Sequence, residues 1–526
     1  MKNKYIIPVL FALLVGCWNT SCDDYLNVNP DNRPDINTED KVIKLLVSAY
    51  PNCNYPYIFE MMSDNSDEFE GNWSEYNYTQ QQAYKWDEMT NSGDNDSPYH
   101  LWESSYTAIS SANLALKSIE EMGGATTATL RAAKGEALMC RAYNHFILAN
   151  IFCQAYGANS SSDMGIPYSD FVESEVSPHY ERGTVEEVYQ KINDDIEEAL
   201  PLIDNNIYKI PQYHFNRSAA YAFAARFNLF YGKDFQKVID YSSQVLTENP
   251  SGVLRDWAYF SSLDVNEMIP GNDFINSSAS LMLISAYSDY GLILANYGLG
   301  TKYGHGLYLS TTETFSSNGP WGDENAFYFK AFQNSSAMPR VFLRKVNRYV
   351  EYTDPVAGIG YACSVLPAFT TDETLLNRAE AYALTKQYDR AIEDVNTLLG
   401  NLCKTNINKT NLELDSVVKY YARMNYYTPT KPTPKKVINS GTYTIVNDGV
   451  MENLLQYILH VRRITTIHEG MRWFDVKRYG MEIYRRRFSK MNEITVTDFL
   501  PANDLRRAVQ LPQEVTSAGL PANPRP

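Results

Sequence analysis

The sequence predicts an all-α fold, a scaffold of tetratricopeptide-like helical repeats with long loop-rich insertions that carry little strand. Two segments 153 positions apart match each other, Gly232–Tyr241 and Lys386–Asp394, with Phe235 aligned to Tyr388. Each segment follows a stretch rich in alanine and aromatic residues, which is typical of paired helices that pack closely around an aromatic at their turn. Ordinary helix bundles also use alanine in this way, so a bundle stays open as an alternative.

The first 21 residues predict a secretory signal peptide. Lys2 and Lys4 precede an apolar run from Ile6 to Val15, about half of the roughly twenty residues that a membrane-spanning helix needs. Two cysteines near its end are candidates for lipid attachment. Cys17 follows Leu-Val-Gly, the context that a lipoprotein peptidase prefers, whereas Cys22 follows Asn-Thr-Ser. The local context alone favours Cys17.

Helical periodicity continues along the mature chain. One apolar stripe at spacings of three and four runs from His100 to Met122, and a longer helix is expected from Leu130 to Tyr156. Thr184, followed by Val-Glu-Glu, is typical of a capped helix start. We expect residues 22–526 to form a single unit. Its helical scaffold takes about 36–62, 100–250, 371–403 and 451–490, and its loop-rich, ligand-facing parts take about 63–99, 251–370, 404–450 and 491–526.

Charge and cysteine use exclude several classes of protein. The chain has 46 Lys and Arg against 62 Asp and Glu, a net charge of −16, which does not suit nucleic acid or anionic lipid. The cysteines beyond the signal region show no CxxC pair and no metal-ligand spacing. No later segment approaches a membrane span, so we expect the mature chain to reach the membrane by its lipid anchor only.

Signatures of catalysis are missing from the sequence. It contains no GxSxG, HExxH or P-loop motif, and its seven histidines include no pair at metal-ligand spacing. We therefore predict that the protein is not an enzyme and binds no cofactor. A structural calcium ion stays open, because six acids in one loop could supply hard oxygen ligands, although a solvated acidic loop is the preferred interpretation. These acids are Asp64, Asp67, Glu68, Glu70, Asp94 and Asp96.

The positive signal is aromatic. The chain has 40 tyrosines and 7 tryptophans, and they crowd the loop-rich parts. One group lies between Trp73 and Trp86, and a second runs from Tyr287 to Trp321 among glycines and serines. Sugars pack their C–H faces on such rings while their hydroxyl groups bind nearby polar side chains. This clustering predicts a carbohydrate ligand.

Two motifs together resemble one protein family. Val461–Gly480 is expected to form an amphipathic helix that turns at Glu469-Gly470 and resumes, and Cys22–Pro30 reads Cys-Asp-Asp-Tyr-Leu-Asn-Val-Asn-Pro. Both are similar to the ends of the SusD/RagB family, outer-membrane lipoproteins that capture nutrients, usually glycans, for a TonB-dependent transporter. The resemblance covers residues 22–526. It places the lipid on Cys22, which directly precedes the Asp-Asp-Tyr-Leu segment, and we choose Cys22 over Cys17.

The resemblance also implies where a ligand binds. In the family, ligand contacts come from the loop before the first tryptophan-bearing helix, here 71–99, and from the insertion between repeats, here about 285–325. We expect Trp86 and Trp321 to be exposed stacking platforms that flank one saccharide site, because their polar, glycine-bearing surroundings offer no obvious core. The full set of glycan-binding candidates is Trp73, Trp86, Tyr290, Tyr303 and Trp321.

The carboxyl-terminal motif is expected to be structural. In the family, the Glu469–Asp475 segment has a structural role, so we assign it no ligand contact. The basic residues around it are interpreted as paired charges on a solvated helix. They are Arg462, Arg463, Arg472, Lys477, Arg478 and Arg485 to Arg487.

Together these features predict a cell-surface glycan-binding lipoprotein of the outer membrane that faces the cell exterior. The family implies that it delivers an oligosaccharide to a SusC-like TonB-dependent transporter. One alternative is a RagB-like, peptide-capturing lipoprotein of the same architecture, and another is a non-catalytic protein-interaction scaffold. The tyrosine-rich loops weigh against both, since a peptide groove needs fewer stacked rings and a scaffold leaves those loops unexplained.

Overall fold

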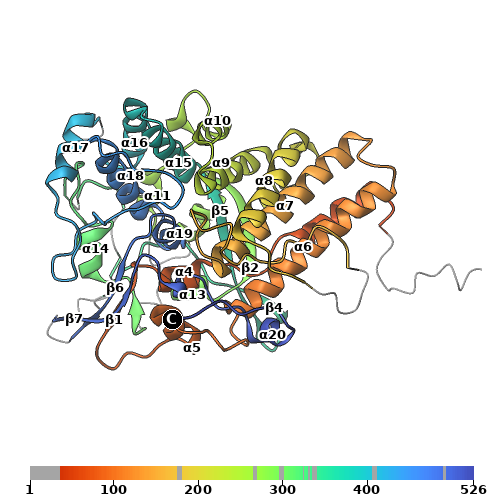
Figure 1. Ribbon diagram of the computed structural model, residues 1–526, viewed down its shortest axis with the longest axis horizontal. Coiled ribbons are helices and arrows are strands. Elements are labelled where there is room, and N and C mark those ends of the chain that lie inside the picture. The colour runs from red at the N-terminus through yellow and green to blue at the C-terminus, as the bar shows by residue number, and fades with distance from the viewer. Residues whose placement is uncertain are drawn as a thin grey trace, which may run out of the picture.

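The computed structural model describes residues 36–173, 180–264, 269–294, 301–323, 325–329, 332–333, 340–404, 411–489 and 493–526. The signal peptide and both candidate lipid sites, Cys17 and Cys22, lie outside these residues. Figure 1 shows helices packed along the right and top of the molecule and strands gathered mainly below them. Within the described part of the chain, none of the helices combines the length and the hydropathy that a membrane crossing needs.

The helices that the periodicity predicts in the first half of the chain are confirmed. The two long ones are α6 (Pro98–Glu121) and α7 (Ala128–Phe152), which pack against each other and against α8 (Val185–Ala199). Thr184 caps α8 in a full capping box with Glu187, as its spacing predicts. Three shorter helices precede them, α3 (Glu39–Leu46), α4 (Pro56–Met62) and α5 (Tyr78–Lys85).

Each of the two matching segments belongs to a pair of consecutive helices. The first pair is α9 (Arg217–Tyr231) with α10 (Phe235–Leu246), and the second is α15 (Thr371–Leu384) with α16 (Tyr388–Leu402). Phe235 and Tyr388 each begin the second helix of a pair, and both are only half-buried. One segment covers both rings, because Tyr443 lies 5.2 Å from Phe235 between ring centroids and Asp448 accepts a hydrogen bond from the Tyr388 hydroxyl.

Beside the helices, the described residues form two small sheets, in a chain whose insertions were expected to carry little strand. One sheet has the order β3-β1-β6-β7 and the other β2-β5-β4. Insertions this long carry backbone N–H and C=O groups that need partners when buried, and strand pairing supplies them. The strand β6 even lies within 451–490, which was expected to be helical. The strands are β1 (Asp67–Phe69), β2 (Ser280–Tyr287), β3 (Tyr303–Gly304), β4 (Tyr349–Asp354), β5 (Ile359–Thr370), β6 (Ile483–Phe488) and β7 (Ile494–Leu500).

The predicted turn at Glu469-Gly470 is confirmed between α18 (Met451–Thr465) and α19 (Met471–Arg478). Gly470 has φ +74°, and a Cβ there would lie 2.8 Å from Pro56 Cα. Its N–H donates to Glu60 Oε1 at 2.9 Å. A side chain is thus excluded by both backbone conformation and space. The remaining α-helices are α11 (Trp257–Ser262), α12 (Ile269–Asn276), α13 (Tyr290–Ile293), α14 (Leu307–Glu313), α17 (Leu414–Arg423) and α20 (Gln513–Ser517).

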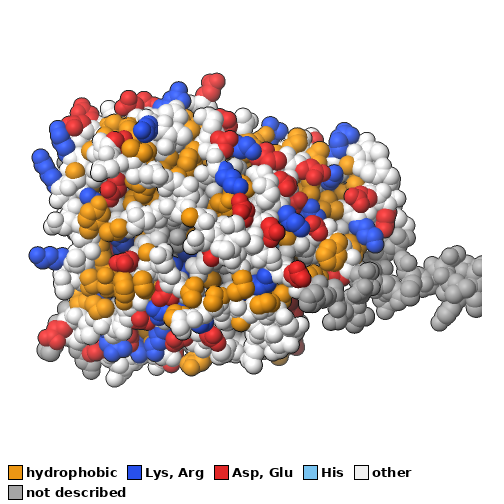
Figure 2. All heavy atoms as spheres, viewed as in Figure 1, with side chains coloured by type: hydrophobic (Ala, Val, Ile, Leu, Met, Phe, Trp, Pro, Cys, Tyr) orange, Lys and Arg blue, Asp and Glu red, His pale blue; other side chains and the backbone are white. Residues whose placement is uncertain are grey.

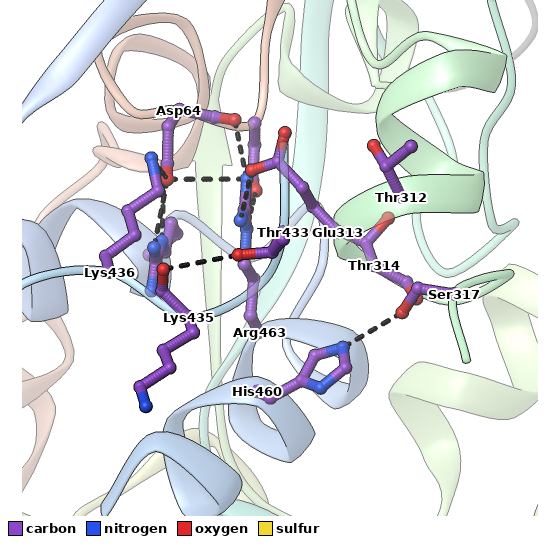
Figure 3. Close-up of polar contacts among 12 residues, drawn as sticks. Asp64, Thr312, Glu313, Thr314, Ser317, Thr433, Lys435, Lys436, His460 and Arg463 are labelled. Carbon is purple, nitrogen blue, oxygen red and sulfur yellow. Dashed lines mark hydrogen bonds and ion pairs between the residues drawn. The ribbon is translucent and has the colours of Figure 1, made fainter. Parts of the chain in front are cut away.

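Several basic residues around this motif are in ion pairs, as expected, but most of them are buried rather than on a solvated helix, so that part of the interpretation is wrong. Figure 3 shows Asp64 facing Lys436 and Arg463, with Glu313 on Arg463 as well. Arg472 donates to Asp64 at 2.7 Å, and Lys436 lies 2.6 Å from the same carboxylate. Burial alone would raise the pKa of Asp64, but the three cations hold it well below its ordinary range.

The same ionic layer continues to either side. Arg486, on β6, contacts Asp67 at 2.9 Å and Glu313 at 2.8 Å. Glu380, on α15, accepts from Arg478 at 2.9 Å, from the Tyr479 hydroxyl at 2.6 Å and from Arg462. These side chains are buried because each charge meets an opposite one across elements that are far apart in the sequence.

The acids considered for calcium belong largely to this layer. Asp64, Asp67, Glu68 and Asp96 are buried rather than solvated, and Glu68 pairs with Lys302 and Arg487 at 3.0 Å each. Among the residues that the structure describes, no group of three or more His, Cys, Asp or Glu side chains is arranged to hold a metal ion. The interpretation as a solvated acidic loop is therefore wrong for these four.

Candidate functional site

The structure brings together the two regions that the sequence assigns to the ligand. The Asp96 carboxylate accepts hydrogen bonds from the Ser288 hydroxyl at 2.5 Å and from the Asp289 N–H at 2.8 Å. Residues 74 and 301, one from each region, also form an isolated β-bridge. Burial raises the pKa of Asp96 to about 7, although both hydrogen bonds act to lower it. We call the Asp96–Ser288–Asp289 contact the clasp.

A groove opens beside the clasp, between residues 88–99 and the carboxyl-terminal tail. Its volume is about 400 Å³. It presents two carboxylates, three amides, four hydroxyl groups and one tyrosine ring, a set that suits a ligand with many hydroxyl groups. These residues are Glu88, Glu514, Asn91, Gln510, Gln513, Thr90, Ser92, Ser97, Thr516 and Tyr99.

Both walls of the groove are fixed by hydrogen bonds. On one wall, Ser97 caps α6 by accepting from the His100 N–H at 3.3 Å. On the other, the Gln510 side chain donates to the Asn523 carbonyl at 3.0 Å and accepts from the Asn523 N–H at 2.7 Å. The Asn523 side chain donates to the Phe152 carbonyl at 2.8 Å, while Arg182 donates to it at 2.7 Å. The tail is therefore held against the end of α7.

Trp86 and Trp321 are buried, so the expectation that they are exposed stacking platforms is wrong. Trp86 is 4% exposed; its ring lies 3.9 Å from the Arg485 guanidinium and its N–H donates to the Met62 carbonyl at 2.8 Å. Trp321 is fully buried, with its ring centroid 5.3 Å from Phe327. The physical reason is that the loops fold over the ionic layer and need apolar side chains to exclude water from it.

The other three candidates are also placed. Tyr290 is fully buried, and Tyr303 is buried against Tyr84 with their ring centroids 4.4 Å apart. Trp73 is half-buried, with the Arg340 guanidinium 4.2 Å from its ring centroid. None of the five lines the groove. That any of them contacts a ligand stays a prediction, and Trp73 is the one with ring surface open to solvent.

Sequence reasoning located one wall of the groove closely and the other only within a broad region. Residues 88–99 lie in the predicted region 71–99, whereas the tail wall, from Gln510 to Ala522, lies in no predicted ligand region of the family. The tail belongs to 491–526, which was expected to be loop-rich and ligand-facing as a whole. Its amides and prolines carry no periodic pattern, so the sequence contained no signal that distinguishes a groove wall from an ordinary extended end.

Comparisons with known families identify the chain. The family described as "Starch-binding associating with outer membrane" matches residues 24–229, and the family described as "SusD family" matches residues 330–514. This protein belongs to the SusD/RagB family. A search of curated proteins gives no significant match. The second match contains the Glu469-Gly470 motif.

Solved structures share the fold of this SusD/RagB protein. A SusD superfamily protein of Bacteroides thetaiotaomicron is 17% identical, with a TM-score of 0.60 over 93% of this chain and 100% of that chain. One from Bacteroides fragilis is 17% identical, with a TM-score of 0.61 over 93% and 99%. A SusD-like carbohydrate binding protein of Bacteroides vulgatus is 16% identical, with a TM-score of 0.58 over 91% and 96%. The helical fold with small sheets is therefore that of the family.

Proposed function

We propose that this SusD/RagB protein captures an oligosaccharide at the cell surface in the groove between residues 88–99 and the tail. The observation that carries the proposal is the groove itself, which joins amides, hydroxyl groups and carboxylates at the edge of both predicted ligand regions. Family membership supports a carbohydrate-binding role, and the fold supports binding rather than catalysis. A peptide ligand of the RagB-like kind is the second candidate.

The anchor, the location, the partner and the repeat architecture in this proposal are those that the family resemblance implies. The protein is a lipoprotein attached through Cys22 to the outer membrane, and it passes its ligand to a SusC-like TonB-dependent transporter. The helix pairs α9–α10 and α15–α16 are tetratricopeptide-like repeats. A single lipid anchor and a net charge of −16 are compatible with this position at the membrane surface. On the face seen in Figure 2, blue and red side chains of the described residues are interspersed, and no continuous blue area forms there that would suit nucleic acid.

A binding experiment with a matched control tests the groove. Glu88→Ala with Gln513→Ala removes two exposed polar side chains from opposite walls. We expect this double variant to lose at least about tenfold in affinity, about 1.4 kcal/mol, for the best glycan from an array, at an unchanged melting temperature. The control, Gln244→Ala with Glu248→Ala, removes the same residue types from an exposed site near the end of α10.

The array also decides between the candidate ligands. Full-length protein, purified in detergent, is applied to glycans and to peptides side by side. Binding to glycans that the groove variant loses and the control keeps supports the proposal. Binding to peptides alone would replace it with the RagB-like alternative, and equal binding by the variant and the control would place the site elsewhere.

A further inference from the structure

A cluster of tyrosines lies outside the core on one face of the β2-β5-β4 sheet. Cys363 of β5 is paired with Tyr287 of β2 on one side and with Tyr349 of β4 on the other. Two residues before Cys363, Tyr361 is paired with Glu351. Residues directly opposite each other in antiparallel strands, and alternate residues along one strand, project from the same face. The three tyrosines and Glu351 therefore share one face of the sheet, which we call the tyrosine face.

The tyrosine face is exposed to solvent. Tyr361 is 57% exposed, and Ser285, two residues before Tyr287 on β2, is exposed as well. The intervening residues, such as Ala286 and Ser364, are buried on the other side. An aromatic ring as exposed as that of Tyr361 contributes little to folding, and clusters of exposed rings mark interaction sites.

The rings are held in place rather than free to turn. The centroids of Tyr287 and Tyr361 are 5.5 Å apart at an interplanar angle of 63°. The Tyr349 hydroxyl donates to the Asn272 side chain at 2.6 Å. The Glu351 carboxylate acts on the Tyr287 hydroxyl and raises its pKa. Fixed rings lose little conformational entropy when a ligand packs on them, which favours binding through a few contacts.

The chemistry of this face fits a carbohydrate better than a protein surface. Its rings alternate with a carboxylate and an amide, so an apolar sugar face can pack on a ring while the hydroxyl groups at its edge meet acceptors. A protein partner would favour a continuous apolar core with few charged residues. The aliphatic side chains of the hairpin gather at its tip instead, where Val356 is fully exposed and Ile359 is 60% exposed.

The tyrosine face and the groove are connected through the clasp. The clasp joins Asp96 to Ser288. Ser97 of the groove follows Asp96 in the chain, and Tyr287 precedes Ser288. Each of the two surfaces thus starts one residue from the same hydrogen bond.

We propose that the tyrosine face is a second carbohydrate-binding surface, which packs on sugar rings of a chain that extends beyond the groove. This inference rests on the proposed function and specifies its ligand as a linear oligosaccharide longer than the groove alone accommodates. The groove would then bind one part of the chain, and Tyr287 and Tyr361 would stack against a more distant part.

Chain length provides the test. Full-length protein is screened by affinity electrophoresis against starch, xylan, arabinan, mannan and pectic galactan. Calorimetry then uses short and long oligosaccharides of the polysaccharide that binds. Tyr287→Ala with Tyr361→Ala should lower the affinity for the long chain at least tenfold and leave the short chain unaffected. Tyr361→Ala alone, at a position 57% exposed, should lower the long-chain affinity in the same direction without any effect on folding.

The hairpin supplies a matched control. Tyr352 is 55% exposed and lies next to Glu351 in β4, so its ring projects from the opposite face. Tyr352→Ala should change neither affinity. Equal losses in Tyr352→Ala and Tyr361→Ala, or an unchanged long-chain affinity in the double variant, would overturn the inference. If the groove variant loses binding while the tyrosine variants keep it, this inference is wrong and the proposed function stands. If the wild type binds none of the five polysaccharides and no arrayed glycan, the proposed function is wrong, and this inference is wrong with it.

Discussion

Replacing Glu380 by Gln should destabilise the protein at neutral pH and have less effect in acid. This carboxylate on α15 meets Arg462 of α18, Arg478 of α19 and the Tyr479 hydroxyl, and it is fully buried. Gln keeps the shape of the side chain but removes its charge. Two buried guanidinium groups would then lose one of their counter-charges, and breaking a buried ion pair in this way costs about 3–5 kcal/mol.

The pKa gives an independent magnitude and the sign of the pH dependence. Burial alone would raise the pKa of Glu380, but Arg462, Arg478 and the Tyr479 hydroxyl lower it from 4.5 to about 2. At about 1.4 kcal/mol per pH unit, the lowered pKa corresponds to about 3 kcal/mol of stability at neutral pH. Because the folded-state pKa lies below the ordinary value, this stability is present above pH 4.5 and is lost as the pH falls toward 2.

Urea unfolding of the wild type and Glu380→Gln at pH 7, 5, 4 and 3 measures both effects. The gap between their midpoints should be widest at pH 7 and should narrow below pH 4.5, where the unfolded wild type binds a proton on this carboxyl group while the folded state, with its lowered pKa, stays ionised. Glu393→Gln, at an exposed position on α16, is the control and should stay within about 0.5 kcal/mol of wild type. A gap that is absent at pH 7, or that is the same at pH 7 and pH 3, would refute the reasoning.

Three further predictions concern single side chains. Trp86→Ala should cost roughly 3–5 kcal/mol of stability, as for a buried aromatic, and a melting temperature equal to wild type would contradict its place in the core. Phe235→Ala and Tyr388→Ala should each cost about half as much, because both rings are half-buried; denaturant midpoints measure this, and a loss at only one position would mean that the two helix pairs are not equivalent. Cys22→Ala should release the protein from the membrane fraction and Cys17→Ala should not, with mass spectrometry of the mature amino terminus as the check; lipid on Cys17 would reverse the assignment.

The sequence predicts those parts of the fold that depend on local pattern. The spacing of apolar residues predicts α6 and α7, and the capping box at Thr184 predicts the start of α8. The Glu469-Gly470 motif predicts a turn that requires a left-handed glycine. Each of these signals lies within a few consecutive residues. Helix formation responds to such neighbours, so one sequence is enough to recognise it.

The parts that were predicted wrongly depend on partners that are distant in the sequence. Arg485 and Arg486 look like a solvated basic run, yet on β6 they meet the carbonyls of Met61 and Met62 and the carboxylate of Asp67. Trp86 looks exposed in its polar loop, but Arg485 covers its ring. In both cases the burial is decided by segments some 400 positions away, and no periodicity records that pairing.

The candidate site was predicted in part for the same reason. The aromatic and polar composition of 71–99 pointed to a stretch of chain that lines the groove, but Trp86 fills the core and Trp73 lies outside the groove lining. The residues that line the groove are short polar ones, which resemble those of any exposed loop. Which of them face a common space follows from how the tail folds back, and this is a property of the whole molecule.

The tail wall has a consequence for the order in which the groove can be completed. Tyr99 and Gln510, on opposite sides of the groove, are separated by more than four hundred residues, and Asn523 must reach α7 before that wall is fixed. A ribosome makes the chain from its amino terminus, so the first wall exists long before the second has been synthesised. The groove is therefore complete only when residues 510–523 have folded back against α7. A chain truncated even slightly before Asn523 would carry nearly all of the fold and lack the completed groove.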